Sequence, residues 1–159
     1  MADLLKTEDV AASLFDHLQA TLDGVYVHRP GEAWDGKPEE WAEVRITRVE
    51  RDGMSRRGEE SYPVVIAVTC FSRRGRKGGK FKTLDAFCDK VRPAFDSTAL
   101  AKAIKVRDEG KRVVAILDFG PAVEARTYNV AVDVEGVSHP GTDVATISVR
   151  CVLSRSAHV

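Results

Sequence analysis

The alternation of apolar and polar residues near the C-terminus is the pattern that most restricts how this chain can fold. Apolar side chains occupy the odd-numbered positions from Ala145 to Leu153, and Thr146, Ser148 and Arg150 lie between them. A period of two places all the apolar side chains on one face of an extended strand. The pattern predicts a half-buried strand, which needs neighbouring strands and a layer that covers its apolar face.

Other segments have the composition of strands. Residues 41–49 alternate in the same way, and residues 62–71 are apolar on both faces, which is typical of a central strand. The highly charged segment 50–61 between them is expected to be the tip of a hairpin. Further strands are expected at 25–28, 113–119 and 123–134, with a break at Gly120-Pro121 and a turn at 138–142.

Two segments have helical periodicity. In the first, Val10, Leu14, Leu18 and Leu22 recur every four residues before Gly24. The second has apolar residues at 84, 87, 88, 91 and 95 and is expected to be interrupted near Pro93. A short helical turn is expected within 97–110.

This order of elements, α-β-β-β-α-β-β-β, predicts the α+β class. We expect a single domain over residues 1–159, with a mainly antiparallel or mixed β-sheet and two helices packed on it. The core is expected to join Leu14, Leu18 and Leu22 to Phe87 and Val91. Both helices should cover the sheet face that carries Ile147 and Val149.

Composition excludes several classes of protein. The chain is 43% hydrophobic and 30% charged with a net charge of zero, which is ordinary for a soluble globular protein. No apolar run approaches the roughly 20 residues of a membrane helix, and the acidic N-terminus does not resemble a signal peptide. Cys70, Cys88 and Cys151 lie in apolar surroundings, so we expect reduced, buried thiols in a cytoplasmic setting.

Charge is distributed unevenly along the chain. Residues 1–43 contain ten acidic and three basic residues, whereas the segment FSRRGRKGGKFKT at 71–83 contains no acid. The cations of that segment form the candidate assembly or DNA-facing loop: Arg73, Arg74, Arg76, Lys77, Lys80 and Lys82. A second candidate interface comprises Trp34, Trp41, Arg56 and Arg57.

No catalytic or ligand-binding motif is complete. The segment 71–83 differs from a P-loop, because three residues separate Gly75 from Gly79 and Phe81 follows Lys80. The four histidines lack metal-ligand spacing, and no GxSxG sequence is present. The sequence therefore predicts no enzyme, no cofactor and no metal.

In the order of its elements and in their residue patterns, the chain resembles the tail terminator (tail completion) proteins of long-tailed bacteriophages. The resemblance covers roughly residues 8–153 and rests on these segments: EDVAASLFDHLQATL, a Pro/Gly/Trp loop that leads into WAEVRITRV, the charged hairpin before PVVIAVTCFSR, LDAFCDKVRPAF and ATISVRCVLS. The basic loop is longer and more charged than the usual strand-to-helix connector of that family.

The resemblance implies a viral structural subunit located at the junction of tail and neck, and assembled in the host cytoplasm. Such subunits form a homohexameric ring that caps the tail tube, ends tail polymerisation and joins the tail to the head connector. Its implied partners are therefore other copies of the chain, the tube protein, the connector or neck protein, and DNA that passes through the lumen without sequence specificity. No membrane is implied.

Three alternatives remain at this point. The chain could be a small nucleic-acid-binding protein that uses residues 73–82, although that loop contains only one aromatic residue, Phe81. It could be another phage neck or head–tail joining protein. It could also be an enzyme whose site is assembled from scattered loops.

Overall fold

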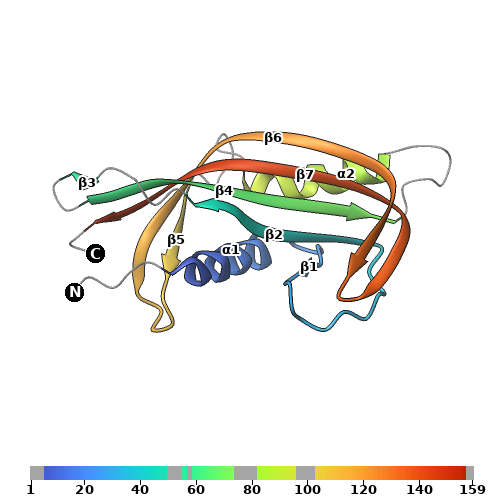
Figure 1. The fold of residues 1–159 in the computed structure, drawn as a ribbon, viewed down its shortest axis with the longest axis horizontal. Helices are drawn as coiled ribbons and strands as arrows, with labels where there is room; N and C mark the ends of the chain where they lie inside the picture. Colours follow the sequence, from blue (N-terminus) through green and yellow to red (C-terminus); the bar gives the residue numbers. More distant parts are fainter. Residues whose placement is uncertain (1–5, 50–54, 57–58, 74–81, 96–102, 157–159) are drawn as a thin grey trace.

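The computed structural model describes residues 6–49, 55–56, 59–73, 82–95 and 103–156 (Figure 1). Its elements in chain order are α1 (Thr7–Thr21), β1 (Val27–His28), β2 (Glu40–Val49), β3 (Ser55–Arg56), β4 (Glu59–Ser72), α2 (Lys82–Val91), the 3₁₀ turn η1 (Arg92–Ala94), β5 (Ala103–Arg107), β6 (Val113–Val134) and β7 (Val137–Ser156). The expected α+β class, with two helices and a mainly antiparallel sheet, is confirmed.

The sheet has the strand order β1-β2-β4-β7-β6-β5, and β3 pairs with β4 outside this path. Among the described strands β1 and β2 are parallel, and the other pairs are antiparallel. The pairing of β4 with β7 runs without a register shift from Glu59↔Ser156 to Ser72↔Asp143. Figure 1 shows β4, β7 and β6 as three long neighbouring strands that extend from one end of the molecule to the other.

The core lies between the helices and the inner face of this sheet. All five apolar residues at odd positions from Ala145 to Leu153 are buried, as the alternation predicts. The facing positions on β4, from Val64 to Cys70, are buried in the same cluster. The expected packing of the two helices in one core is confirmed. The same cluster contains Leu14, Leu18, Leu22, Phe87 and Val91.

The expected break at Gly120-Pro121 is a β-bulge inside one strand, β6. The register with β7 shifts between Phe119 and Ala122, so the strand continues past the proline. A Cβ on Gly120 would lie 2.5 Å from the carbonyl oxygen of Arg150. Glycine is therefore required here by the close approach of the β7 backbone.

One other expectation is tested only in part, and one is wrong. Within 97–110, residues 103–107 form strand β5, in which Ile104 and Val106 alternate with exposed residues and are buried against the core, whereas residues 97–102 lie outside the described residues. The segment 138–142 is part of strand β7, whereas the turn lies at Glu135 and Gly136, both of which have positive φ. The hairpin tip expected at 50–61 is described only in part. In it, β3 pairs with the start of β4, and residues 50–54 and 57–58 lie outside the described residues.

Leu18→Ala should destabilise the protein by about 2–5 kcal/mol, because the leucine is fully buried between α1 and the sheet and its truncation leaves a cavity. Urea unfolding measures the change. Gln19→Ala, at an exposed position on the same helix, is the control and should change the free energy of unfolding by no more than about 0.5 kcal/mol. Equal effects for the two variants would place α1 outside the core.

Gly120→Ala should cost about 1–3 kcal/mol, because the new methyl group overlaps the Arg150 carbonyl oxygen and the β6–β7 backbones must separate. The matched control is Gly110→Ala in the β5–β6 turn, where a Cβ would make an ordinary 3.4 Å contact. In thermal unfolding, the melting temperature of Gly120→Ala should be clearly lower than that of the parent and that of the control. A Gly120→Ala variant as stable as the parent would contradict the close approach.

Candidate functional site

The basic segment joins β4 to α2 at one end of the sheet (Figure 1). Its first cation, Arg73, is fixed by two hydrogen bonds to the 29–40 loop. The backbone N–H of Arg73 donates to the carbonyl oxygen of Glu39 at 2.8 Å, and its guanidinium donates to that of Gly36 at 2.9 Å. Arg73 therefore ties the end of β4 to that loop, a role that its position in a charged run did not indicate.

The other cations predicted for this surface are only partly placed. Arg74, Arg76, Lys77 and Lys80 lie outside the described residues, and Lys82 is the first residue of α2. In the second candidate interface, Arg56 belongs to β3 and Arg57 lies outside the described residues. The assignment of these residues to an assembly or DNA-facing surface stays a prediction.

Both tryptophans belong to an aromatic cluster on the outer face of the sheet. Trp41 has no exposed surface, and its ring stacks on that of Phe71, its cross-strand partner, at 4.8 Å between centroids. Trp34 is half-buried at 5.0 Å from Trp41, and its indole N–H donates to Nε2 of His139 at 2.7 Å. Val134 completes the buried part of the cluster. The two tryptophans thus connect the 29–40 loop to the β6–β7 hairpin.

A second contact between the same segments is polar. The Glu135 carboxylate accepts a 2.7 Å hydrogen bond from the backbone N–H of Gly31 and lies 3.2 Å from Nε2 of His28. The Gly31 N–H, followed by the His28 contact, holds the pKa of Glu135 below its ordinary value. His28 is buried, and its Nδ1 has no partner. More than 100 residues separate Glu135 from His28 along the chain, so no local sequence signal could have indicated this pair.

Glu43 is a buried acid next to this contact. Burial raises its pKa above the ordinary 4.5, although the nearby charge of Arg45 acts in the opposite direction. Its carboxylate is 3.3 Å from the Arg45 guanidinium, which is largely exposed. The ion pair therefore compensates only part of the cost of burying the charge.

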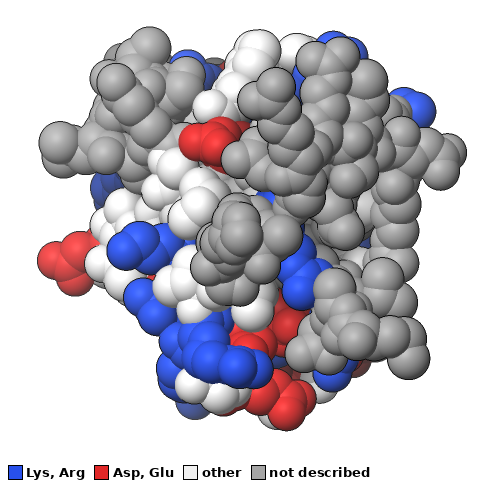
Figure 2. All heavy atoms as spheres, turned by 90° about the vertical axis from the view of Figure 1, so that its left-hand side faces the viewer, with Lys and Arg blue, Asp and Glu red and all other residues white. Residues whose placement is uncertain are grey.

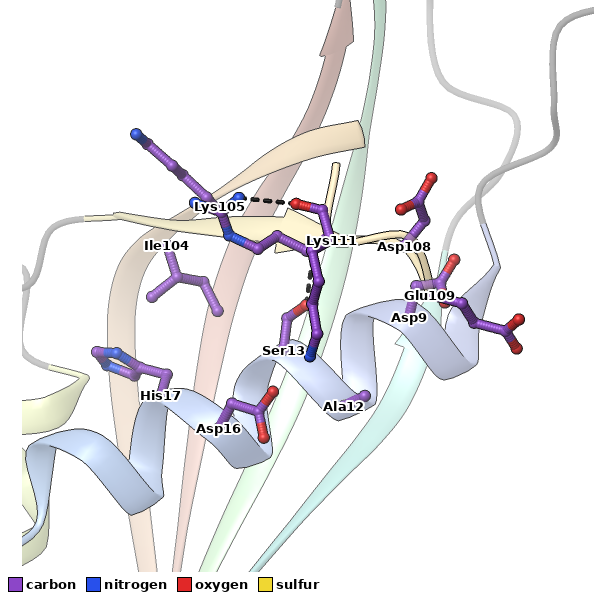
Figure 3. Close-up of a pocket in the computed structure, with 11 residues that line it drawn as sticks. Asp9, Ala12, Ser13, Asp16, His17, Ile104, Lys105, Asp108, Glu109 and Lys111 are labelled. Carbon is purple, nitrogen blue, oxygen red and sulfur yellow. Dashed lines mark hydrogen bonds between the residues drawn. The ribbon is translucent and has the colours of Figure 1, made fainter. Parts of the chain in front are cut away.

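A charged groove of about 480 Å³ lies between α1 and β5 (Figure 3). Carboxylates line it from α1 and from the β5–β6 turn, and cations line it from β5 and the same turn. The charged residues are Asp9, Asp16, Asp108, Glu109, Lys105, Arg107 and Lys111. Among the described residues, no ion pair joins Asp9 or Asp16 to a cation across the groove. The groove thus presents opposite charges that a charged partner can reach.

The groove also contains Ser13 and His17, but the pair is not a catalytic dyad. The Ser13 hydroxyl accepts a hydrogen bond from the backbone N–H of Arg107 at 3.0 Å. His17 makes hydrogen bonds with both ring nitrogens, to the Ala94 carbonyl oxygen at 2.9 Å and to the Thr21 hydroxyl at 3.3 Å. These contacts attach α1 to β5 and η1, and they give both half-buried polar side chains a structural role.

The same end of the molecule carries exposed cations on the β5–β6 hairpin. Figure 2 shows Lys and Arg side chains gathered in the lower part of this end, beside Asp and Glu. Lys105, Arg107, Lys111 and Arg112 are exposed in this hairpin. Sequence analysis missed this surface because its cations are interrupted by Asp108 and Glu109 and by the apolar residues of β5.

Two of the three buried thiols, Cys70 and Cys151, are weak nucleophiles, whereas the hydrogen bond with Cys70 lowers the pKa of the Cys88 thiol. The hydrogen bond that Cys70 shares with Cys88, together with burial, raises the pKa of the Cys70 thiol. Burial raises the pKa of Cys151 to about 12. Both thiols are therefore protonated at neutral pH and are weak nucleophiles.

Within the described residues, no group of three or more His, Cys, Asp or Glu side chains is arranged to hold a metal ion. None of the described helices is long and apolar enough to cross a membrane.

Comparison with known proteins leaves the family open. No family model matches this chain, and the search of curated proteins found no match. The functional assignment therefore rests on the chain itself.

Glu43→Gln should stabilise the protein at pH 7.5, because it removes a carboxylate whose raised pKa shows that burial disfavours its charge. The folded state holds the Glu43 proton more tightly than the unfolded state, so the cost grows as pH rises from 4.5 through the folded pKa. The gain should accordingly vanish at or below about pH 4. Thermal unfolding between about pH 4 and 7.5 measures the gain in stability. Glu32→Gln, at an exposed position, is the control. A gain that does not depend on pH would contradict the assignment.

Proposed function

We propose that this protein is a tail-terminator-type subunit of a long-tailed bacteriophage. Copies of it close into a hexameric ring on the finished tail tube, end tube polymerisation and present a surface to the head connector. DNA passes through the lumen of the ring without sequence-specific contacts. The protein acts at the tail–neck junction of the virion and is assembled in the host cytoplasm.

The observation that carries this proposal is the arrangement of the elements. An N-terminal helix, a long central strand that leads through a basic segment into the second helix, and a long C-terminal strand beside the central one follow the order that the family resemblance implies. Ser13 and His17 of the α1–β5 groove are engaged in structural hydrogen bonds. The arrangement favours a structural role over catalysis.

The distribution of charge supports closure into a ring. Ring contacts are heterologous, so one subunit needs two different complementary surfaces. The basic segment leaves the sheet at the end where β4 stops, whereas the β5–β6 hairpin and the start of α1 lie at the opposite end (Figure 1). Acidic side chains of α1, Asp9 and Asp16, line the groove there. The basic segment of one subunit can thus meet the carboxylates of its neighbour's groove, which lie beside the exposed cations of the β5–β6 hairpin.

The purified protein, alone or with tail tubes, should form a species of about six times 17.4 kDa. Light scattering coupled to size exclusion measures the mass, and negative-stain images should show rings. Replacement of Arg74, Arg76, Lys77 and Lys80 by serine should weaken assembly, most strongly at raised salt, because the contact is electrostatic. Arg73 is kept, since it holds the 29–40 loop in place.

A matched control removes the same amount of charge elsewhere. It replaces four exposed cations, Lys6, Lys37, Lys90 and Arg150, by serine and should assemble like the parent. Both variants should keep nearly the parent's unfolding free energy, because exposed charges contribute little. A monomer in all conditions, with or without tubes, contradicts the proposal. A monomer that binds DNA through the basic segment would instead identify a nucleic-acid-binding protein.

A further inference from the structure

The end of the β6–β7 hairpin is held against the 29–40 loop by very few polar contacts. Beyond Ser72, where β4 ends, the hairpin continues without that neighbour and turns at Gly136. Figure 1 shows this part bending away from the sheet toward the segment between β1 and β2. The polar contacts include the hydrogen bond from Trp34 to His139 and those of Glu135 with Gly31 and His28. The apolar packing of Trp34 with Trp41 and Val134 also holds this junction, and the loss of one of these bonds weakens it.

The bond from Trp34 fixes the protonation state of His139. An indole nitrogen can only donate, so Nε2 of His139 accepts and carries no proton. The neutral imidazole must then carry its proton on Nδ1. The side chain is almost fully buried, with 3% of its surface exposed, and the rings of Trp34 and Trp41 lie 5.7 and 5.5 Å from it.

Protonation of Nε2 is incompatible with this contact. It would place two N–H donors 2.7 Å apart, at a histidine that is almost fully buried. The indole N–H would lose its acceptor, and a cation would remain among aromatic rings. The lowest-energy response is for His139 and Trp34 to separate, which parts the hairpin from the loop.

We propose that His139 is a pH-sensitive latch, and that its protonation releases the end of the β6–β7 hairpin from the 29–40 loop. The latch does not depend on the function proposed above. It belongs to the subunit fold, and it predicts that acid loosens the junction before the rest of the sheet unfolds.

Charged groups on the neighbouring elements change how readily His139 binds a proton. The Arg73 cation, at the end of β4, disfavours protonation, and Asp133, on β6, favours it. Burial has the largest effect and, with Arg73, holds the pKa of His139 below its ordinary value of 6.5. The neighbouring Glu135 carboxylate stays ionised at mildly acidic pH, because the Gly31 N–H lowers its pKa. The hairpin tip should thus open through His139 first.

The direction of the pH effect follows from the depressed pKa. The unfolded chain binds a proton at His139 more readily than the folded chain does. The contribution of the latch is therefore complete above pH 6.5 and decreases as pH falls toward the folded pKa, by about tenfold in the opening equilibrium per pH unit. Below the folded pKa it decreases no further.

Hydrogen exchange of the full chain between pH 7.5 and 5 tests the proposal. Protection factors, which correct for the pH dependence of chemical exchange, should fall across residues 130–139 and 29–40 while those of 64–70 stay constant. In His139→Gln the amide oxygen can accept the Trp34 N–H but does not titrate, so protection should no longer depend on pH in this range. His158→Gln, a histidine beyond the described residues, is the control and should behave like the parent.

An NMR titration of the parent gives a second readout that does not require a stable variant. The His139 Cε1 proton should titrate below pH 6.5, and in Trp34→Phe, which lacks the N–H donor, its midpoint should rise. Protection that is equal at pH 7.5 and 5 in the parent would overturn the proposal. So would a His139→Gln variant that loses protection with the same midpoint as the parent.

Discussion

The unbroken pairing of β4 with β7 is the constraint on which the rest of the structure depends. These strands keep one register from Glu59↔Ser156 to Ser72↔Asp143, so their apolar residues stay on the same face along the whole length. A shift of β7 by one residue would turn Ile147 away from the face that carries Ile66. The two helices cover that face, and burial of their apolar stripes is the main source of stability. β1, β5 and the β6–β7 hairpin are added at the margins of this layer.

The candidate functional features lie where the regular sheet ends. At the end where β4 stops, Arg73 is bonded to the 29–40 loop, and that loop meets the β6–β7 hairpin through His139 and Glu135. At the other end, α1 covers β5 and leaves the charged groove. A central layer that is rigid, with different polar surfaces at its two ends, is suited to a subunit that contacts its neighbours head to tail. The latch at one of these ends gives such a contact a means of responding to pH.

Much of the fold could be predicted from local pattern, because burial on one face leaves a period in the sequence. The alternation at 145–153 and the four-residue spacing from Val10 to Leu22 both identified buried faces correctly. β5 was missed because five residues between charged segments give too short a period to recognise. The turn was placed at 138–142 because Pro140 and Gly141 are typical turn residues, yet register shifts in β6 accommodate them within a continuous hairpin.

The candidate site could be predicted only as a distribution of charge. Its contacts join residues far apart in sequence, such as Trp34 with His139, and no local pattern encodes them. The tail-terminator assignment is tested most directly by electron microscopy of particles from a phage that lacks this protein. The account predicts tails of abnormal length, or tails that do not join heads. Virions with joined tails of normal length would contradict it.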